Sequence, residues 1–85
     1  MEYVIVAFRS RSDTIDFSSL LKEKGVFSEI VNTPKEAGVG CGLSVKVNKG
    51  NFYIVKRLVF LTNKKSFAGF FLVKQLAGKR IVKSI

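Results

Sequence analysis

Apolar and polar positions along the chain form blocks that predict strands and helices in a mixed order. Residues 3–8 are a continuous apolar, β-branched and aromatic run, which is typical of a buried strand, and we expect this strand to be central. Apolar residues then recur at helical spacing until Gly25, and Ser10, Ser12 and Asp13 offer side chains for the N-cap. The chain therefore begins with a strand followed by an amphipathic helix.

The middle of the chain combines short strand patterns with a glycine-rich loop. Thr33-Pro34 ends the first of these strands, because proline cannot donate to a ladder and pushes the residue before it to extended geometry. Cys41 is the fourth residue of the loop, which we name the cysteine loop, and is expected at the mouth of the next strand. The predicted elements are a strand at 26–32, a one-turn helix at 34–37, the cysteine loop at 38–42 and a half-exposed strand at 43–47.

The segment 52–61 is compatible with two structures. Its β-branched and aromatic content favours a strand, whereas Asn51 as an N-cap and apolar residues at helical spacing favour a helix. Residues 66–75 predict another buried strand, and 80–85 a short final strand. With a helix at 52–61, the order β-α-β-β-α-β predicts an α+β, ferredoxin-like sandwich. Its antiparallel sheet carries two helices on one face and an extra C-terminal edge strand.

Length and charge sharpen this picture. The chain has 85 residues, below the ~100 to 150 usual for a domain, and we expect a single domain over residues 1–85. The net charge of +9 is unevenly distributed: five bases and all six acids lie at or before Glu36, and ten bases without any acid follow it. We interpret the basic second half as a docking surface beside Cys41 for an acidic partner. Nucleic acid, anionic lipid and a merely solvated face remain alternatives.

The histidine and cysteine counts restrict the chemistry. The chain has no histidine, which removes Ser-His-Asp and Cys-His nucleophilic sites and all histidine metal sites. We therefore expect no enzyme activity, no cofactor and no metal. The single cysteine cannot form an internal disulfide, which favours the reducing cytoplasm. The longest uncharged stretch, 37–45, is far shorter than the roughly 20 apolar residues of a membrane span.

Several local patterns coincide with those of one known family. They are a Tyr-Val-Ile strand at 3–8, a helix ending in Lys-Glu-Lys-Gly at 22–25, the element Pro34-Lys35-Glu36, and Cys41-Gly42-Leu43 opening the next strand. On these residues the chain resembles the putative selenium/sulfur carrier protein-like family, a small bacterial family, as far as Val73. The family pattern has a helix at 52–61. The sequence departs from it in the spacer at 37–40, which usually carries serines, and in the segment after Gln75, which extends beyond the usual end.

The resemblance implies a carrier in which Cys41 transiently holds a persulfide or its selenium analogue. The implied partners are a donor protein, such as a cysteine desulfurase, and an acceptor protein. A reactive thiolate is favoured by backbone N–H groups and nearby cations, which Gly40, Gly42, Lys35 and Lys46 could supply. Pro34 and Glu36 are expected to shape the loop. The competing interpretation of Cys41 is a small buried apolar residue.

A second hypothesis is a nucleic-acid-binding or protein-docking module without thiol chemistry. The predicted element order is shared with RNA-recognition modules, and residues 65–73 interleave basic, glycine and aromatic residues. That pattern falls on the last long strand rather than on the strand between the helices. The pattern also fails in register, and core packing explains Phe67, Phe70 and Phe71 adequately, so we rank this hypothesis second. An exposed sheet edge could pair with a second copy, and the sequence leaves dimerisation open.

Overall fold

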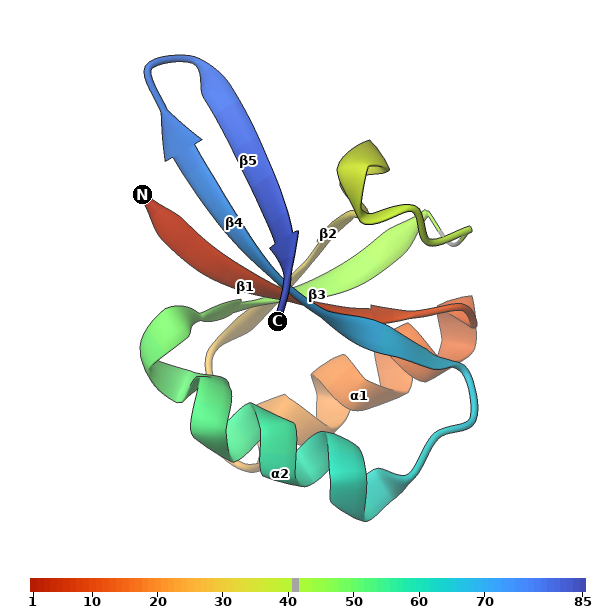
Figure 1. Ribbon diagram of the computed structural model, residues 1–85. Coiled ribbons are helices and arrows are strands. Elements are labelled where there is room, and N and C mark those ends of the chain that lie inside the picture. Colours follow the sequence, from red (N-terminus) through yellow and green to blue (C-terminus); the bar gives the residue numbers. More distant parts are fainter. Residues whose placement is uncertain (41) are drawn as a thin grey trace.

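The computed structural model describes residues 1–40 and 42–85 (Figure 1). Their elements follow the predicted order, and the α+β class is confirmed. The bounds are β1 (Glu2–Phe8), α1 (Arg11–Glu23), β2 (Ser28–Asn32), the short 3-10 helix η1 (Lys35–Ala37), β3 (Leu43–Asn48), the 3-10 turn η2 (Lys49–Asn51), α2 (Phe52–Thr62), β4 (Phe67–Leu76) and β5 (Lys79–Ser84).

The five strands form one antiparallel sheet in the order β2-β3-β1-β4-β5. As expected, β1 is central, and β5 is the extra edge strand beside β4. Both α-helices lie on the same side of the sheet, whereas η1 lies on the other side (Figure 1). The ferredoxin-like arrangement predicted from the element order is therefore present, with a fifth strand added at the C-terminal end.

The undecided segment 52–61 is a helix, α2. Val55 and Val59, one turn apart, are buried against the sheet, so the helical spacing of the apolar residues prevails over their β propensity. Asn63 ends the helix in the left-handed conformation, with a φ of 48°. Its backbone N–H donates to the carbonyl oxygen of Val59.

The ends of α1 explain why β2 starts two residues later than expected. At the beginning of the helix, the Ser10 hydroxyl accepts a hydrogen bond from the backbone N–H of Asp13 at 3.2 Å, as the predicted N-cap requires. At the end, Gly25 adopts a φ of 74°, and the N–H of Val26 donates to Leu21 at 2.9 Å. That amide closes the helix, so the ladder between β2 and β3 begins only at Ser28.

The central strand β1 is buried on both faces, which explains its unbroken apolar run. Val4, Val6 and Phe8 belong to the core between the sheet and the helices, whereas Ile5 and Ala7 belong to a smaller core on the opposite face. We call this smaller group the second core. Its buried members are Ile5, Ala7, Phe71 and Val73, and Ala37, Val39 and Val82 are among the partly buried residues packed against it. The residues before Cys41 therefore lie over the second core.

Candidate functional site

The segment that joins β2 to β3 carries the motif singled out by the sequence. Cys41 itself lies outside the described residues, so the site is built from the residues on either side of it. The segment closes at its base, where the N–H of Thr33 donates to the carbonyl oxygen of Gly42 at 3.0 Å. The hydroxyls of Thr33 and the buried Ser44 lie 2.6 Å apart. These two contacts hold the two ends of the segment together.

The short helix η1 fixes the first half of the segment. Pro34 is buried, and its carbonyl oxygen accepts the N–H of Ala37 at 3.1 Å. Gly38 caps η1 with a φ of 67°, a conformation that glycine adopts without steric cost, and donates to Lys35 at 3.1 Å. Ala37 packs against the second core, as does Val39 in the cysteine loop. The approach to Cys41 is thus held by both hydrogen bonds and apolar contacts.

An ion pair joins η1 to the edge strand β5. The guanidinium of Arg80 donates to both carboxylate oxygens of Glu36, at 2.8 and 3.1 Å. This paired geometry holds the pKa of Glu36 below its ordinary value of 4.5, with a backbone hydrogen bond at Glu36 adding to the effect. The same hydrogen bond raises the pKa of Arg80. Glu36 is therefore ionised at neutral pH and ties η1 to a strand 44 residues away.

The two glycines beside Cys41 are not explained by backbone geometry. Both Gly40 and Gly42 are exposed, and neither has a positive φ. A Cβ atom built on either glycine would meet no heavy atom within 4 Å. The fold thus tolerates a side chain at both positions, in contrast to Gly38.

The two lysines expected beside Cys41 are placed differently. Lys35 is exposed in η1, within the same segment as the cysteine loop. Lys46 lies in β3, and its Nζ sits 4.4 Å from the centroid of the Tyr3 ring. Because Tyr3 pairs with Asn48 at the far end of β3, this side chain extends away from the loop. Pro34, Lys35, Glu36, Gly40 and Gly42 therefore share one segment, and Lys46 does not join them.

Three residues of this framework were missed by the sequence analysis. Ser44 sits at a polar position of an alternating strand pattern, yet it is fully buried under Thr33. Arg80 is one of ten bases in the second half, and no sequence signal distinguishes it as the partner of Glu36. Thr33 was interpreted only as the end of a strand, and its contact with Ser44 was not predicted. No sequence signal points to the Thr33–Ser44 contact, because the alternating pattern of residues 43–47 predicts that Ser44 faces solvent.

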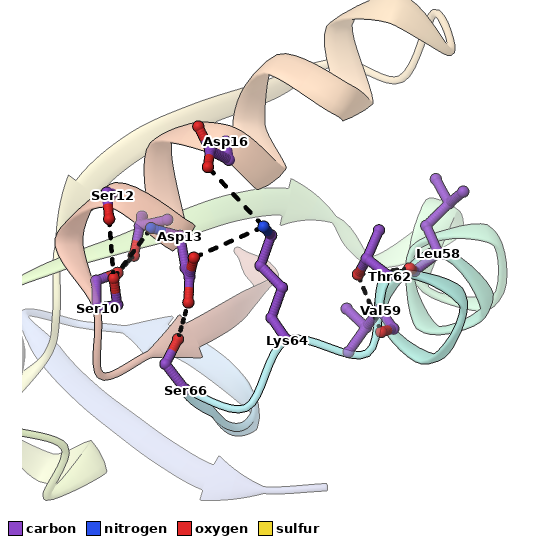
Figure 2. Close-up of polar contacts among 10 residues, drawn as sticks. Ser10, Ser12, Asp13, Asp16, Leu58, Val59, Thr62, Lys64 and Ser66 are labelled. Atoms are coloured by element: carbon purple, nitrogen blue, oxygen red, sulfur yellow. Dashed lines mark hydrogen bonds and ion pairs between the residues drawn. The ribbon is translucent and has the colours of Figure 1, made fainter.

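Several of the second-half bases pair with first-half acids. Lys64 contacts Asp13 at 3.6 Å and Asp16 at 3.8 Å, and the Ser66 hydroxyl donates to Asp13 at 2.6 Å (Figure 2). At the other end of the sheet, Lys49 and Lys74 both contact Glu2, at 2.6 and 3.3 Å. With Arg80 included, four of the ten bases form ion pairs among the described residues. The uneven charge distribution therefore contributes to joining the two halves of the chain.

The aromatic residues of β4 are packed inside the molecule. Phe67 lies 5.8 Å from Phe8 and 4.9 Å from Phe70, measured between ring centroids, and Phe70 is in edge contact with Phe52. Phe71 is buried in the second core. An RNA-recognition sheet displays such rings to bases, so this arrangement does not favour the RNA hypothesis.

The described residues contain no cluster of three or more His, Cys, Asp or Glu side chains suited to a metal ion. Neither helix in this part of the chain is long and apolar enough to cross a membrane.

Comparison with known proteins agrees with the resemblance noted in the sequence. Residues 2–71 match the family described as "Putative Se/S carrier protein-like". The match covers the chain from β1 into β4, including η1 and the cysteine loop, and ends before β5. No curated protein and no solved structure matches the chain. Because the match spans most of its length, the chain belongs to the putative Se/S carrier protein-like family.

Proposed function

We propose that the protein carries sulfur or selenium on Cys41, between a donor and an acceptor protein. The observation that supports this proposal is the family match over residues 2–71, which includes the lone cysteine and the held segment that leads to it. The glycines on both sides of Cys41 add to it. Since the fold does not require them, their small size is explained by the close approach of another protein's active site.

The proposed transfer is a thiol exchange that needs no oxidant. The Cys41 thiolate attacks the terminal sulfur of a persulfide on the donor, for example a cysteine desulfurase. The sulfur–sulfur bond of the donor breaks, and its electron pair leaves with the donor cysteine, which takes up a proton. Cys41 is then a persulfide. A nucleophile of the acceptor attacks the terminal sulfur and releases Cys41 as thiolate; a sulfur–selenium bond reacts in the same way.

The residues around Cys41 have supporting roles in this proposal. Backbone N–H groups at Gly40 and Gly42 and the cation of Lys35 favour the thiolate form of the cysteine. Pro34 and Glu36 keep η1 in place, the latter through Arg80. No catalytic base or cofactor is needed, because the attacking thiolate, the transferred atom and the leaving thiolate carry out the exchange themselves. A reducing cytoplasm keeps the free thiol available.

Incubation with a cysteine desulfurase and free cysteine tests the proposal. Intact-mass spectrometry should show one added sulfur atom on the wild-type protein, removed by a thiol reductant. Cys41→Ser is the control and should gain nothing. If wild type stays unmodified under conditions that load an established sulfur carrier, and also with a selenium donor, the proposal is wrong.

A further inference from the structure

The outward face of α2 carries an unusual concentration of exposed apolar side chains. Tyr53 is 84% exposed, Phe60 64% and Leu61 75%, and Ile54 is also exposed. The inward face, with Val55, is already buried against the sheet, so these residues are not needed for the core. Single exposed apolar residues are ordinary, but four on one helix of 11 residues indicate a contact surface.

This face is hollowed along the helix axis. A groove is lined by Phe52, Lys56 and Phe60 on one side, and by Tyr53 and Arg57 on the other. Each row is made of residues four positions apart, which form a ridge on a helix surface. A groove between two such ridges is the feature into which a ridge of side chains from another helix packs.

The same face is positively charged and lacks acids. Lys56 and Arg57 are exposed, and α2 contains no Asp or Glu. The Lys56 Nζ lies 5.9 Å from the Phe52 ring centroid, and within the described residues neither cation forms an ion pair. A partner that buries this face must therefore bring its own carboxylates, because an unpaired buried charge is costly.

A second copy of the chain has no helix that carries two or more unpaired carboxylates among the described residues. Glu2, Asp13, Asp16 and Glu36 already pair with bases inside the fold. The remaining two acids are Glu23 at the end of α1 and Glu29 in β2. Because they are on different elements, they do not form a row of carboxylates on one helix.

A bilayer and a nucleic acid fit the face less well. Arg57 stands in the same ridge as Tyr53 and Leu61, one turn from each, so inserting those apolar side chains into lipid would carry the guanidinium with them. Helices that lie on membranes separate the apolar and cationic faces instead. In a nucleic acid, phosphates would pair with the cations and bases could stack on the aromatic rings, but the exposed aliphatic side chains of Ile54 and Leu61 would have no apolar partner.

We propose that the outward face of α2 docks an amphipathic helix of another protein, with apolar residues in the groove and carboxylates beside Lys56 and Arg57. This docking surface goes beyond the carrier function and does not depend on it. The helices and η1 lie on opposite sides of the sheet (Figure 1), so a helix bound to α2 is separated by the sheet from η1.

Photo-crosslinking in the cells that make the protein identifies the occupant. Benzoylphenylalanine replaces Tyr53, and, as a matched control, Phe27, which is 65% exposed beside β2. Position 53, and not position 27, should cross-link to a protein segment of amphipathic, acidic sequence. A synthetic peptide of that segment should bind the purified full chain and become helical. Its Kd should rise by at least about tenfold in Arg57→Glu and in Phe60→Ser, as expected for anchoring residues.

Matched substitutions elsewhere separate docking from general effects. Lys83→Glu makes the same charge change as Arg57→Glu, and Phe27→Ser the same truncation as Phe60→Ser; both sites are exposed and should leave the Kd unchanged. Circular dichroism should show all four variants folded. The proposal is overturned if position 53 cross-links to nothing, to a second copy or to a segment without acids, or if the Arg57 and Phe60 variants bind like wild type. It also fails if these variants lose binding to RNA or to phosphatidylglycerol vesicles instead.

Discussion

The three glycines of the cysteine loop differ in whether the fold requires a residue without a side chain. Gly38 has a positive φ and caps η1, so its lack of a side chain has a structural reason. Gly40 and Gly42 have neither a positive φ nor a neighbour within 4 Å of an added Cβ. In the carrier account, these two positions are kept small for a partner that comes close to Cys41.

Alanine at each glycine distinguishes the two reasons. Gly38→Ala should lower the free energy of unfolding by about 1 kcal/mol, because a left-handed conformation is unfavourable for a residue with a Cβ. Gly40→Ala and Gly42→Ala should stay within about 0.5 kcal/mol of wild type in urea unfolding, yet gain sulfur more slowly from the desulfurase. Unchanged loading in both of these variants would remove the argument from partner approach.

The ionised state of Glu36 is another property of a single residue that can be measured. Its pKa lies below the ordinary 4.5 because the Arg80 guanidinium bonds to the carboxylate. The stabilising effect of the pair is complete above pH 4.5 and is lost as the pH falls through the lowered pKa. The side-chain carboxyl carbon, followed by NMR, should titrate below pH 4.5 in wild type and closer to 4.5 in Arg80→Gln. The same midpoint in both proteins would contradict the pairing.

At the scale of elements, β5 gains a role that the family pattern does not contain. The family match ends at residue 71, before this strand begins. Nevertheless β5 supplies Arg80 to Glu36 and packs Val82 against the second core, next to the residues of η1. In this chain the additional strand therefore holds the segment that precedes Cys41.

Exchanging the two charges tests this role of β5. In Arg80→Glu, amide hydrogen exchange at Ala37 and Gly38 should become several-fold faster than in wild type, because two like charges then push η1 from β5. The double variant Glu36→Arg, Arg80→Glu restores opposite charges and should bring the exchange back toward wild type. Equal exchange in wild type and the single variant would show that the ion pair does not hold η1.

The elements that sequence reasoning predicted well are those with a clear hydrophobic period. The unbroken apolar run of β1 predicted a central strand, because only a strand covered on both faces has no polar side. For α2, the sequence did not decide between a helix and a strand. Six of its side chains are exposed and four of these are apolar, so the apolar residues are not confined to the buried face of the helix. The pairing of Glu36 with Arg80 could not be predicted, because it depends on how β5 folds back across the sheet.

At the scale of the whole molecule, the uneven charge distribution has a structural explanation. Acids of the first half pair with bases of the second at both ends of the sheet and at η1. Lys49 and Lys74 hold the pKa of Glu2 below its ordinary value through their hydrogen bonds to it. The bases that form no ion pair among the described residues include Lys56 and Arg57 on α2, which lies on the opposite side of the sheet from η1. The molecule thus separates its proposed docking helix from η1, which leads to the proposed carrier residue.

The cargo of Cys41 in living cells is the most direct test of the carrier account. Cells that make the protein are lysed in an alkylating reagent that traps both thiols and persulfides, and the peptide containing Cys41 is analysed by mass spectrometry. The account predicts a fraction in which an additional sulfur or selenium atom lies between the Cys41 sulfur and the alkyl group. A peptide alkylated only on the Cys41 sulfur itself, in cells where an established persulfide protein shows its extra atom, would contradict the account.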